Sequence, residues 1–422
     1  MMNIPIINIS SQEDFLKKIR GRSAEVQKDV SVVVSEIIEN VKQNGDKALL
    51  EYTHKFDKVK LSSLEIDKSE LFEAYKRSPI SKQLECAAKN IKDYHKNQLR
   101  KGFELKKENG TVIGQKIRPL SRVGIYVPGG TAAYPSSVLM NAIPAKVAGV
   151  EEIIMVTPPQ KNDDILAAAY IAGVDRVFCV GGAQAVAALA YGTESIPKVD
   201  KTVGPGNIFV ATAKRLLYGA MDIDMIAGPS EILIIADDEA PDNYIAADMM
   251  SQAEHDVLAS STVLCFSKEK AENIAKCANK QVLNLSRREI IEQSLENYGG
   301  IIVCENMQNA IDLANEIAPE HLEIMIKDPF SVLDKIKNAG SVFLGYNTPE
   351  PVGDYYAGPN HVLPTSGTAR FFSPLSVDDF IKKYSYLYYT ESALSQECEN
   401  ITALARAEGL TAHAGAVEER KK

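Results

Sequence analysis

The segment from Pro349 to Phe380 combines polar side chains with many Gly, Pro and Ser residues. This composition predicts a long ordered loop without regular helix or strand, and loops of this length in compact domains are usually functional. Its Tyr, Val, Leu and Phe residues can bury apolar surface, which argues against disorder. Asp354 and His361 place a carboxylate and an imidazole within the segment. We therefore expect it to form part of a chemical site.

Two shorter motifs also combine an imidazole with an oxygen-bearing side chain. Gln252 and His255 are three residues apart in a predicted helix, so they should share one face. Glu320 and His321 precede an apolar strand, and a carboxylate beside an imidazole suits proton transfer near neutral pH. Taken alone, each motif is also typical of an ordinary polar helix position or a charged turn.

The chain holds six histidines, and four lie in contexts flanked by Gly, Ala or Pro: His255, His321, His361 and His413. The other two, His54 and His95, lie among charged residues of predicted helices, where we expect them to be solvated. A mixed set of nitrogen and oxygen ligands suits zinc. Gln252, His255, Asp354 and a further imidazole, such as that of His413, could provide such a set. The HExxH spacing is absent, so a zincin is not predicted.

The composition narrows the class of protein. A chain of 422 residues is long enough for two or three domains with separate cores. Its 45% hydrophobic and 24% charged residues exclude membrane, fibrous and disordered classes, and no apolar run approaches the ~18 residues of a spanning helix. A net charge of -9 argues against a nucleic-acid partner, because phosphate binding needs clustered Lys and Arg. Chemistry on a small molecule is favoured.

Two further features concern the cell compartment. The N-terminal sequence lacks a basic start followed by an apolar core, which predicts a cytoplasmic protein rather than a secreted one. Six cysteines are scattered without a CxxC pair, and Cys179, Cys265 and Cys304 fall in apolar strand-like runs. We therefore expect buried, reduced thiols.

Hydrophobic periodicity shows which elements must position these residues. A helical pattern covers 11–98, and an Asn-Gly turn between alternating segments predicts a hairpin over 101–120. From Arg122, apolar runs alternate with helical segments, which predicts a parallel sheet covered on both faces. A second such series begins at Ser230, and after Pro374 the pattern returns to helix.

The predicted fold class is therefore α/β, with two Rossmann-like parallel-sheet domains in tandem, a helical N-terminal segment and a small helical C-terminal segment. The predicted limits are 1–120 for the helical N-terminal region with its hairpin, 121–229 for the first α/β domain, 230–370 for the second and 371–422 for the helical tail. The region 1–120 would be free to pack on the second α/β domain.

Three Gly-rich loops follow strands of the first α/β domain, at 126–137, 181–184 and 204–207. Open parallel sheets bind ligands at the carboxyl ends of their strands. Turns that lead into helix N-termini also direct backbone N–H groups toward an anion such as a pyrophosphate. The fingerprint GxGxxG is absent, so the alternative of ordinary tight turns stays open.

Eight segments in the family's order resemble the histidinol dehydrogenases. They are VGIYVPGG, GGAQAVAALAYGT, VGPGN, AGPSE, SQAEHD, APEHLE, VGDYYAGPNHVLPTSGTAR and EGLTAHAGAV. The similarity extends from about Val30 to the C-terminus. The resemblance implies oxidation of L-histidinol to L-histidine through bound histidinal with two NAD+, a four-electron reaction that ends histidine biosynthesis.

The resemblance also implies roles for residues that match the family's motifs. Its zinc ligands, one ion per subunit, would be Gln252, His255, Asp354 and His413. The catalytic pair would be Glu320 and His321, and the NAD contacts Tyr126, Gln184 and Asn207. The residues that hold the substrate would be Ser137, Ser230, His361 and Glu408, together with the zinc ligands and His321. The last zinc ligand would come from the partner subunit, so a homodimer with its active site at the subunit interface is expected, with the tail 371–422 exchanged between subunits.

These implied roles agree with the chemistry of the residues. His321 would accept the hydroxyl proton while hydride leaves to the nicotinamide. Glu320 would activate a water that adds to the aldehyde, so no cysteine nucleophile is needed. Zinc would mainly orient the substrate by its imidazole and amino nitrogens.

Three alternatives remain at this level. A zinc and NAD-dependent dehydrogenase of another small amino alcohol or polyol is the nearest, although His361 and Glu408 suit a heteroaromatic cation or a diamine better. A zinc hydrolase would share the metal and the general base but would not need NAD. A binding module without catalysis would tolerate replacement of both Glu320 and His321.

Overall fold

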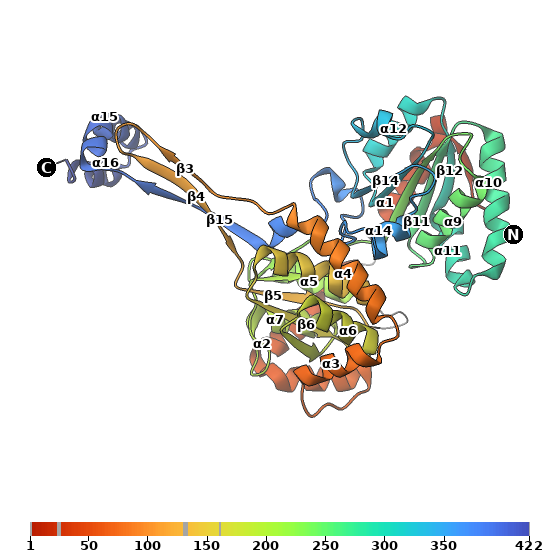
Figure 1. Ribbon diagram of the computed structural model, residues 1–422, viewed down its shortest axis with the longest axis horizontal. Helices are drawn as coiled ribbons and strands as arrows, with labels where there is room; N and C mark the ends of the chain where they lie inside the picture. The colour runs from red at the N-terminus through yellow and green to blue at the C-terminus, as the bar shows by residue number, and fades with distance from the viewer. Residues whose placement is uncertain (1, 23–26, 130–133, 160–161, 422) are drawn as a thin grey trace. The chain divides into compact units, whose positions relative to one another are not determined.

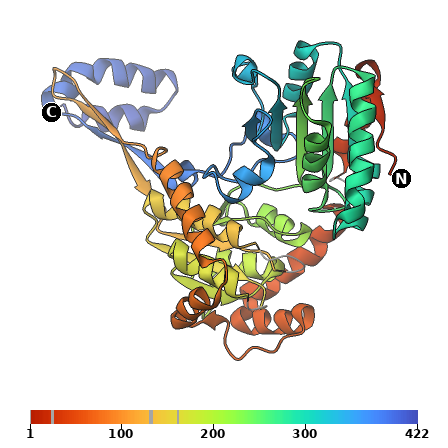
Figure 2. The same cartoon turned by 45° about the vertical axis from the view of Figure 1, so that its right-hand side comes forward.

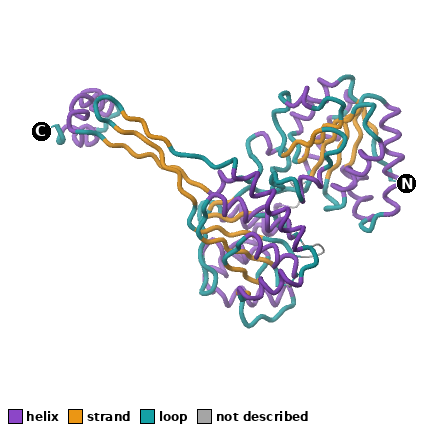
Figure 3. The backbone as a smooth tube through the Cα atoms, in the orientation of Figure 1, coloured by secondary structure: helices purple, strands orange, loops and turns teal. Residues whose placement is uncertain are grey.

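The computed structural model describes residues 2–22, 27–129, 134–159 and 162–421. They form two compact units: the first contains the chain up to Gln98 together with Leu120–Phe380, and the second contains Leu99–Pro119 together with the chain from Ile381 onward. The first unit holds two sheets flanked by helices, as Figure 1 and Figure 3 show. The predicted α/β class with two tandem parallel sheets is confirmed.

The first sheet has the strand order β2-β7-β6-β5-β8-β9. Its strands are β2 (Glu65–Ile66), β5 (Arg122–Tyr126), β6 (Glu152–Thr157), β7 (Arg176–Cys179), β8 (Lys201–Val203) and β9 (Asp222–Ile223). The neighbours from β7 to β9 pair in parallel, whereas β2, from the N-terminal helical region, adds an antiparallel edge. After their first residues, Arg122 and Glu152, the central strands β5 and β6 are almost entirely apolar, because helices cover both faces of the sheet.

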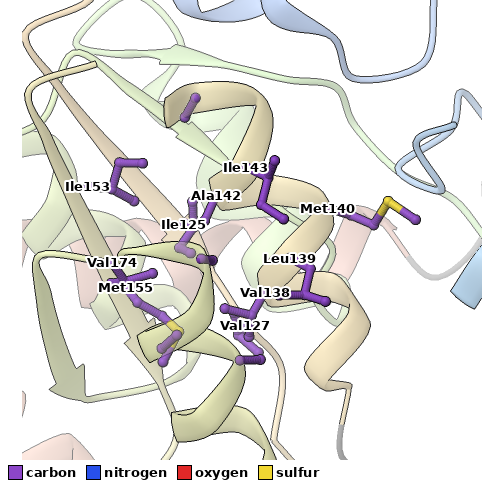
Figure 4. Close-up of a cluster of buried hydrophobic side chains, with 14 of the residues drawn as sticks. Ile125, Val127, Val138, Leu139, Met140, Ala142, Ile143, Ile153, Met155 and Val174 are labelled. Carbon is purple, nitrogen blue, oxygen red and sulfur yellow. The ribbon is translucent and has the colours of Figure 1, made fainter. Parts of the chain in front are cut away.

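Seven helices of the described chain flank this sheet or its edge: α2 (Gln27–Asp57), α3 (Lys68–Arg77), α4 (Ser81–Lys96), α5 (Pro135–Ala148), α6 (Asp163–Ala172), α7 (Gly182–Tyr191) and α8 (Ile208–Leu217). One core cluster contains α5 and α6 residues and the other contains α2, α7 and α8 residues. Figure 4 shows part of the first cluster, where Val138, Leu139 and Ile143 of α5 pack near Ile125 and Met155 of the sheet.

The second sheet is parallel throughout, with the strand order β1-β12-β11-β10-β13-β14. Its strands are β1 (Ile6–Asn8), β10 (Glu231–Ala236), β11 (Ser260–Cys265), β12 (Gly299–Val303), β13 (His321–Met325) and β14 (Ser341–Leu344). Figure 2 shows the N-terminal strand, in red, at the edge of this sheet. The helices of this half are α1 (Glu13–Gly21), α9 (Asp242–Ala253), α10 (Lys268–Gln281), α11 (Arg288–Tyr298), α12 (Met307–Ile317) and α13 (Phe330–Leu333).

The segment from Pro349 to Phe380 differs from the predicted loop because it contains short helices. These are α14 (Glu350–Tyr355) and the 3-10 turns η3 (Thr368–Arg370) and η4 (Val377–Phe380). The prolines that argued against a helix instead flank its start, where proline is tolerated because the first N–H groups have no partner within the helix. The prediction that the segment is ordered holds, since Val362 and Phe380 are buried in the first core cluster.

The second unit begins with the predicted hairpin. Strands β3 (Phe103–Lys106) and β4 (Val112–Pro119) pair antiparallel, and Gly110 at their turn has a φ of 86°, which favours glycine. The prediction that the chain returns directly to helix after Pro374 is wrong, because β15 (Ile381–Tyr388) pairs antiparallel with β4. Its lysines and tyrosines are mostly exposed, so the sequence lacks the apolar face that marks a strand. Helices α15 (Glu391–Ala407) and α16 (Thr411–Glu418) follow.

Two smaller predictions need correction. His95 is buried rather than solvated, with Nδ1 2.7 Å from Oε1 of Gln98 and Nε2 3.4 Å from Nδ2 of Asn360. The six cysteines, all within the described chain, form no disulfide, as predicted, but Cys86 is exposed and Cys277 is only partly buried. Within the described residues, no helix combines the length and apolar character needed to cross a membrane.

Candidate active site

The predicted catalytic pair lies at the amino end of β13, beside the amino end of its neighbour β10. β10 and β13 lie side by side in register, with Ile232 opposite His321. Glu320 immediately precedes β13 and Ser230 immediately precedes β10, so these residues meet at one edge of the second sheet. The helix α9 connects two parallel strands, so its C-terminal end returns to this same edge. The fold thereby brings residues about 70 to 90 positions apart in sequence into one place.

Glu320 is held by the backbone of the neighbouring strand. Its Oε2 accepts a hydrogen bond from the N–H of Glu231 at 2.9 Å. The pKa of Glu320 is raised to about 8, mainly by burial; His321 lowers this pKa in part, and the charge of Glu231 adds to the rise. A carboxylate with a pKa in this range is suited to general base catalysis near neutral pH.

His321 also contacts the backbone of Glu231. Its Nδ1 lies 3.2 Å from the carbonyl oxygen of Glu231, and because a carbonyl only accepts, Nδ1 carries the hydrogen. Nε2 has no hydrogen-bond partner within the described chain. It lies 3.6 Å from Oδ1 of Asp354 and 3.9 Å from Oε1 of Glu350. Burial lowers the pKa of His321, but the nearby carboxylates, Glu350 first, outweigh it and raise that pKa well above its usual value.

Gln252 lies in the last turn of α9 and is fully buried. His255 does not share its helical face as predicted, because α9 ends at Ala253 and His255 follows in the turn. In the amide orientation that the Glu350 carboxylate requires, the Gln252 nitrogen lies 3.2 and 3.3 Å from the two carboxylate oxygens; it also lies 3.1 Å from Nδ1 of His321. We assign the amide hydrogens to Glu350, because Nδ1 of His321 carries a hydrogen of its own and donates it to the Glu231 carbonyl.

Three side chains form a group that could hold a cation: ligand atoms of His255, Glu350 and Asp354 all lie within 4.8 Å of one another. Burial lowers the pKa of His255, which favours the neutral imidazole that binds metals. Sequence reasoning found His255 and Asp354 but missed Glu350. The only feature of the sequence that could have pointed to Glu350 is its place inside the Gly- and Pro-rich segment, because a glutamate between two prolines belongs to no known motif.

The imidazole of His361 contacts the backbone carbonyl of Asp354. Its Nδ1 is 3.0 Å from the carbonyl oxygen of Asp354, so Nδ1 donates and Nε2 is left as an acceptor. The hydroxyl of Ser137 lies 3.4 Å from this Nε2. Burial lowers the pKa of His361. Ser137 comes from α5 of the first sheet, so this pair joins the two halves of the first unit.

One cavity of about 450 Å³ collects these residues. Its lining includes eight of the predicted site residues: Ser137, Ser230, Gln252, His255, Glu320, His321, Asp354 and His361. Glu350 and Arg22, which sequence reasoning did not assign, also line it. The first sheet contributes the turn Gly204–Gly206, which follows the carboxyl end of β8. The cavity thus lies between the carboxyl ends of the strands of the first sheet and the amino ends of the strands of the second.

The three residues matched to NAD contacts lie around the first sheet. Tyr126 is buried at the end of β5, and its hydroxyl accepts a hydrogen bond from the N–H of Gly182 at 3.0 Å. Burial raises the pKa of Tyr126 to about 12. Gln184 is buried in the first turn of α7. Asn207 caps α8 by accepting hydrogen bonds from the N–H groups at 209 and 210. In the predicted loop 126–137, positions 130–133 lie outside the described residues.

The remaining two predicted residues belong to the second unit. Glu408 follows the last residue of α15 and His413 lies in α16. Within the first unit, the structure therefore brings together three of the four predicted zinc ligands with both predicted catalytic residues.

Comparisons with known proteins agree with this arrangement. The family described as Histidinol dehydrogenase matches residues 20–421. A histidinol dehydrogenase from Clostridium acetobutylicum is 56% identical over 418 residues, which cover 97% of this chain and 96% of that protein. One from Caldanaerobacter subterraneus subsp. tengcongensis is 57% identical over 410 residues, covering 96% of this chain and 95% of that protein. The crystal structure of histidinol dehydrogenase from Elizabethkingia anophelis superposes with a TM-score of 0.93 at 36% identity, covering 100% of this chain and 98% of that one.

Proposed function

We propose, from the premise that this chain belongs to the histidinol dehydrogenase family, that it oxidises L-histidinol to L-histidine through bound histidinal with two NAD+. The chain is an oxidoreductase of histidine biosynthesis. The observation that carries the finer proposal is the meeting of the Glu320–His321 pair with His255 and Asp354 in one cavity.

The first oxidation needs a base for the alcohol proton. Nε2 of His321 is the free atom, since Nδ1 donates to the carbonyl of Glu231. As hydride leaves the carbinol carbon for the nicotinamide, the hydroxyl proton passes to this Nε2 and the aldehyde forms. The second oxidation needs water. Glu320 removes a proton from the water that adds to the aldehyde, and the resulting hydrate gives up the second hydride to yield the carboxylate.

We propose zinc as the resident cation, held by Gln252, His255 and Asp354 of one subunit. The donor set fits, because two oxygens and one neutral imidazole suit zinc. Ligand atoms of His255 and Asp354 lie within 4.8 Å of each other, so one cation could contact both side chains. When bound, the ion supplies a positive charge that orients the imidazole and amino nitrogens of the substrate and offsets the charge of Asp354. With that charge offset, the neutral form of His321 is favoured, as its role as a base requires.

The remaining contacts are proposed from family likeness and position. Tyr126, Gln184 and Asn207 would bind NAD, and their places at the end of β5 and the starts of α7 and α8 support this, because helix N-termini attract phosphate. Ser137, Ser230, His361 and Glu408 would hold the substrate. We also keep the limits 121–229 and 230–370 as the proposed NAD-binding and catalytic domains, and the cytoplasm as the proposed compartment.

We propose a homodimer in which His413 of the partner subunit is the fourth zinc ligand and Glu408 of the partner subunit contacts the substrate. Large apolar side chains on the second unit support a further packing partner: Leu387 is 68% exposed and Leu404 is 71% exposed. Large exposed apolar side chains are typical of surfaces that bind another protein when they gather in a patch.

The test is growth of NADH absorbance with L-histidinol and NAD+, compared with a panel of small amino alcohols and polyols. We expect two NADH for each L-histidine and a strong preference for histidinol. Faster turnover of another alcohol would favour the rival dehydrogenase. A zinc-dependent hydrolysis without NADH would contradict the proposal.

A further inference from the structure

Glu350 has no role in the steps above, yet its carboxylate faces two groups that do. It is 2% exposed at the start of α14. Its oxygens lie 3.2 and 3.3 Å from the amide nitrogen of Gln252, and Oε1 lies 3.9 Å from Nε2 of His321. Its own N–H donates to Oε1 of Glu323 at 2.8 Å, which fixes the backbone from which the side chain projects.

We propose that Glu350 is a positioning residue that fixes the amide of Gln252 with its oxygen available to the zinc ion. The inference rests on the proposed zinc site. An amide has one metal-binding end, its oxygen, and a rotation by half a turn replaces that oxygen with a non-binding NH2 group. A carboxylate accepts hydrogen bonds, so Glu350 holds the NH2 group on its own side. Oε1 of Gln252 is then left at the other end of the amide group, turned away from Glu350.

Glu350 is also close enough to His255 and Asp354 to be considered a ligand itself. Its surroundings favour the positioning role. Both of its oxygens are within 3.3 Å of the Gln252 amide nitrogen, and the Ser251 hydroxyl lies 3.4 Å from Oε2. A carboxylate engaged in this way has less freedom to turn toward a cation than Asp354, whose Oδ1 has the imidazole of His321 at 3.6 Å.

The first test is the zinc affinity of the full-length enzyme, prepared free of metal and titrated against a chelator of known affinity. In Glu350→Gln the new amide can pair with Gln252 in either orientation, so the preference for the binding end is lost. We expect the affinity to fall about 10- to 100-fold, the range for partners that orient metal ligands. Saturating zinc should restore most of the turnover of L-histidinol. Unchanged affinity would overturn the proposal.

A double-mutant cycle separates positioning from direct ligation. If Glu350 acts through Gln252, then Glu350→Gln should change zinc affinity little in a Gln252→Ala background. If Glu350 binds the ion itself, the two losses should add, and that result would overturn the positioning role. Both variants keep the rest of the donor set.

Two controls complete the design. Ser251→Ala removes the neighbouring hydroxyl and leaves the carboxylate, so its zinc affinity should stay within a few-fold of the wild type. Thermal unfolding of each metal-free variant shows whether the fold is intact. If the wild-type enzyme itself fails to bind zinc, the proposed function fails; if the wild type binds zinc and Glu350→Gln binds it equally well, only the positioning role fails.

Discussion

Nε2 of His321 lies 3.6 Å from Oδ1 of Asp354, although the first residue starts a strand of the second sheet and the second lies in the short helix α14. The contact joins the proposed base to a proposed zinc ligand. It also makes the protonation of one side chain depend on the charge of the other.

That dependence gives a first prediction. In the metal-free enzyme, Asp354→Asn should lower the pKa of His321, because it removes one of the carboxylates that raise it. NMR titration of imidazole-labelled protein would follow the ring directly. An unchanged His321 titration would mean that Asp354 contributes little to its charge state.

The two oxidation steps should respond differently to loss of Glu320. In Glu320→Gln we expect oxidation of added histidinal to fall about 10²- to 10⁴-fold, the usual contribution of a general base. The first hydride transfer from histidinol should be retained, because His321 is the proposed base of that step. Single-turnover measurement of NADH with histidinol as substrate separates the two steps. Equal losses in both would contradict the division of roles.

The rate of histidinal oxidation should rise with pH. Burial raises the pKa of Glu320 to about 8, and only the deprotonated carboxylate can accept a proton from water. The value of kcat/KM for histidinal should therefore rise with pH and level off above that pKa. A pH–rate profile measures this rising limb. Glu320→Gln should lose this limb while its residual rate persists. A flat profile in the wild-type enzyme would assign the base role to another group.

The same pKa shift should lower the stability of the fold as pH rises, whereas it raises the rate. A carboxyl whose pKa is raised on folding keeps its proton where the unfolded chain has lost it, so folding is weakened as pH rises from 4.5 to about 8. Glu320→Gln cannot ionise, so its stability relative to the wild type should increase across this window. Urea unfolding at several pH values measures the difference. The pH-dependent difference between the two free energies of unfolding should disappear at the acid end of the range.

Mixed dimers test the proposed exchange of the second unit between subunits. His255→Ala and His413→Ala homodimers should each lack a zinc ligand and lose most activity. If the fourth ligand is His413 of the partner subunit, a dimer with one chain of each variant contains one site with every ligand intact. Activity should then reappear on mixing and refolding, and zinc content should rise with it. No recovery would place both ligands on the same chain.

Local patterns predicted much of the first unit. Apolar runs such as EILIIA and alternating helical segments predicted both sheets, because a strand buried on both faces is apolar at every position. The motifs around Gln252, Glu320 and Asp354 were likewise found from residue type and spacing. Patterns of this kind are short-range, so they survive without knowledge of the fold.

Other features depended on contacts that sequence spacing does not record. β15 has an exposed Lys- and Tyr-rich pattern, and only its pairing with β4 shows it to be a strand. His95 has charged neighbours in sequence but is enclosed when Gln98 and Asn360 pack around it.

The amino-acid sequence alone determined the fold class, the family and most of the side chains that could do the chemistry, because these follow from local pattern and residue type. Only the tertiary structure decided that Glu350 faces Gln252 and that the amino edge of one sheet meets the carboxyl edge of the other. Those relationships join residues about 100 positions apart in sequence, and they exist only once the strands have paired and α9 has returned along the second sheet.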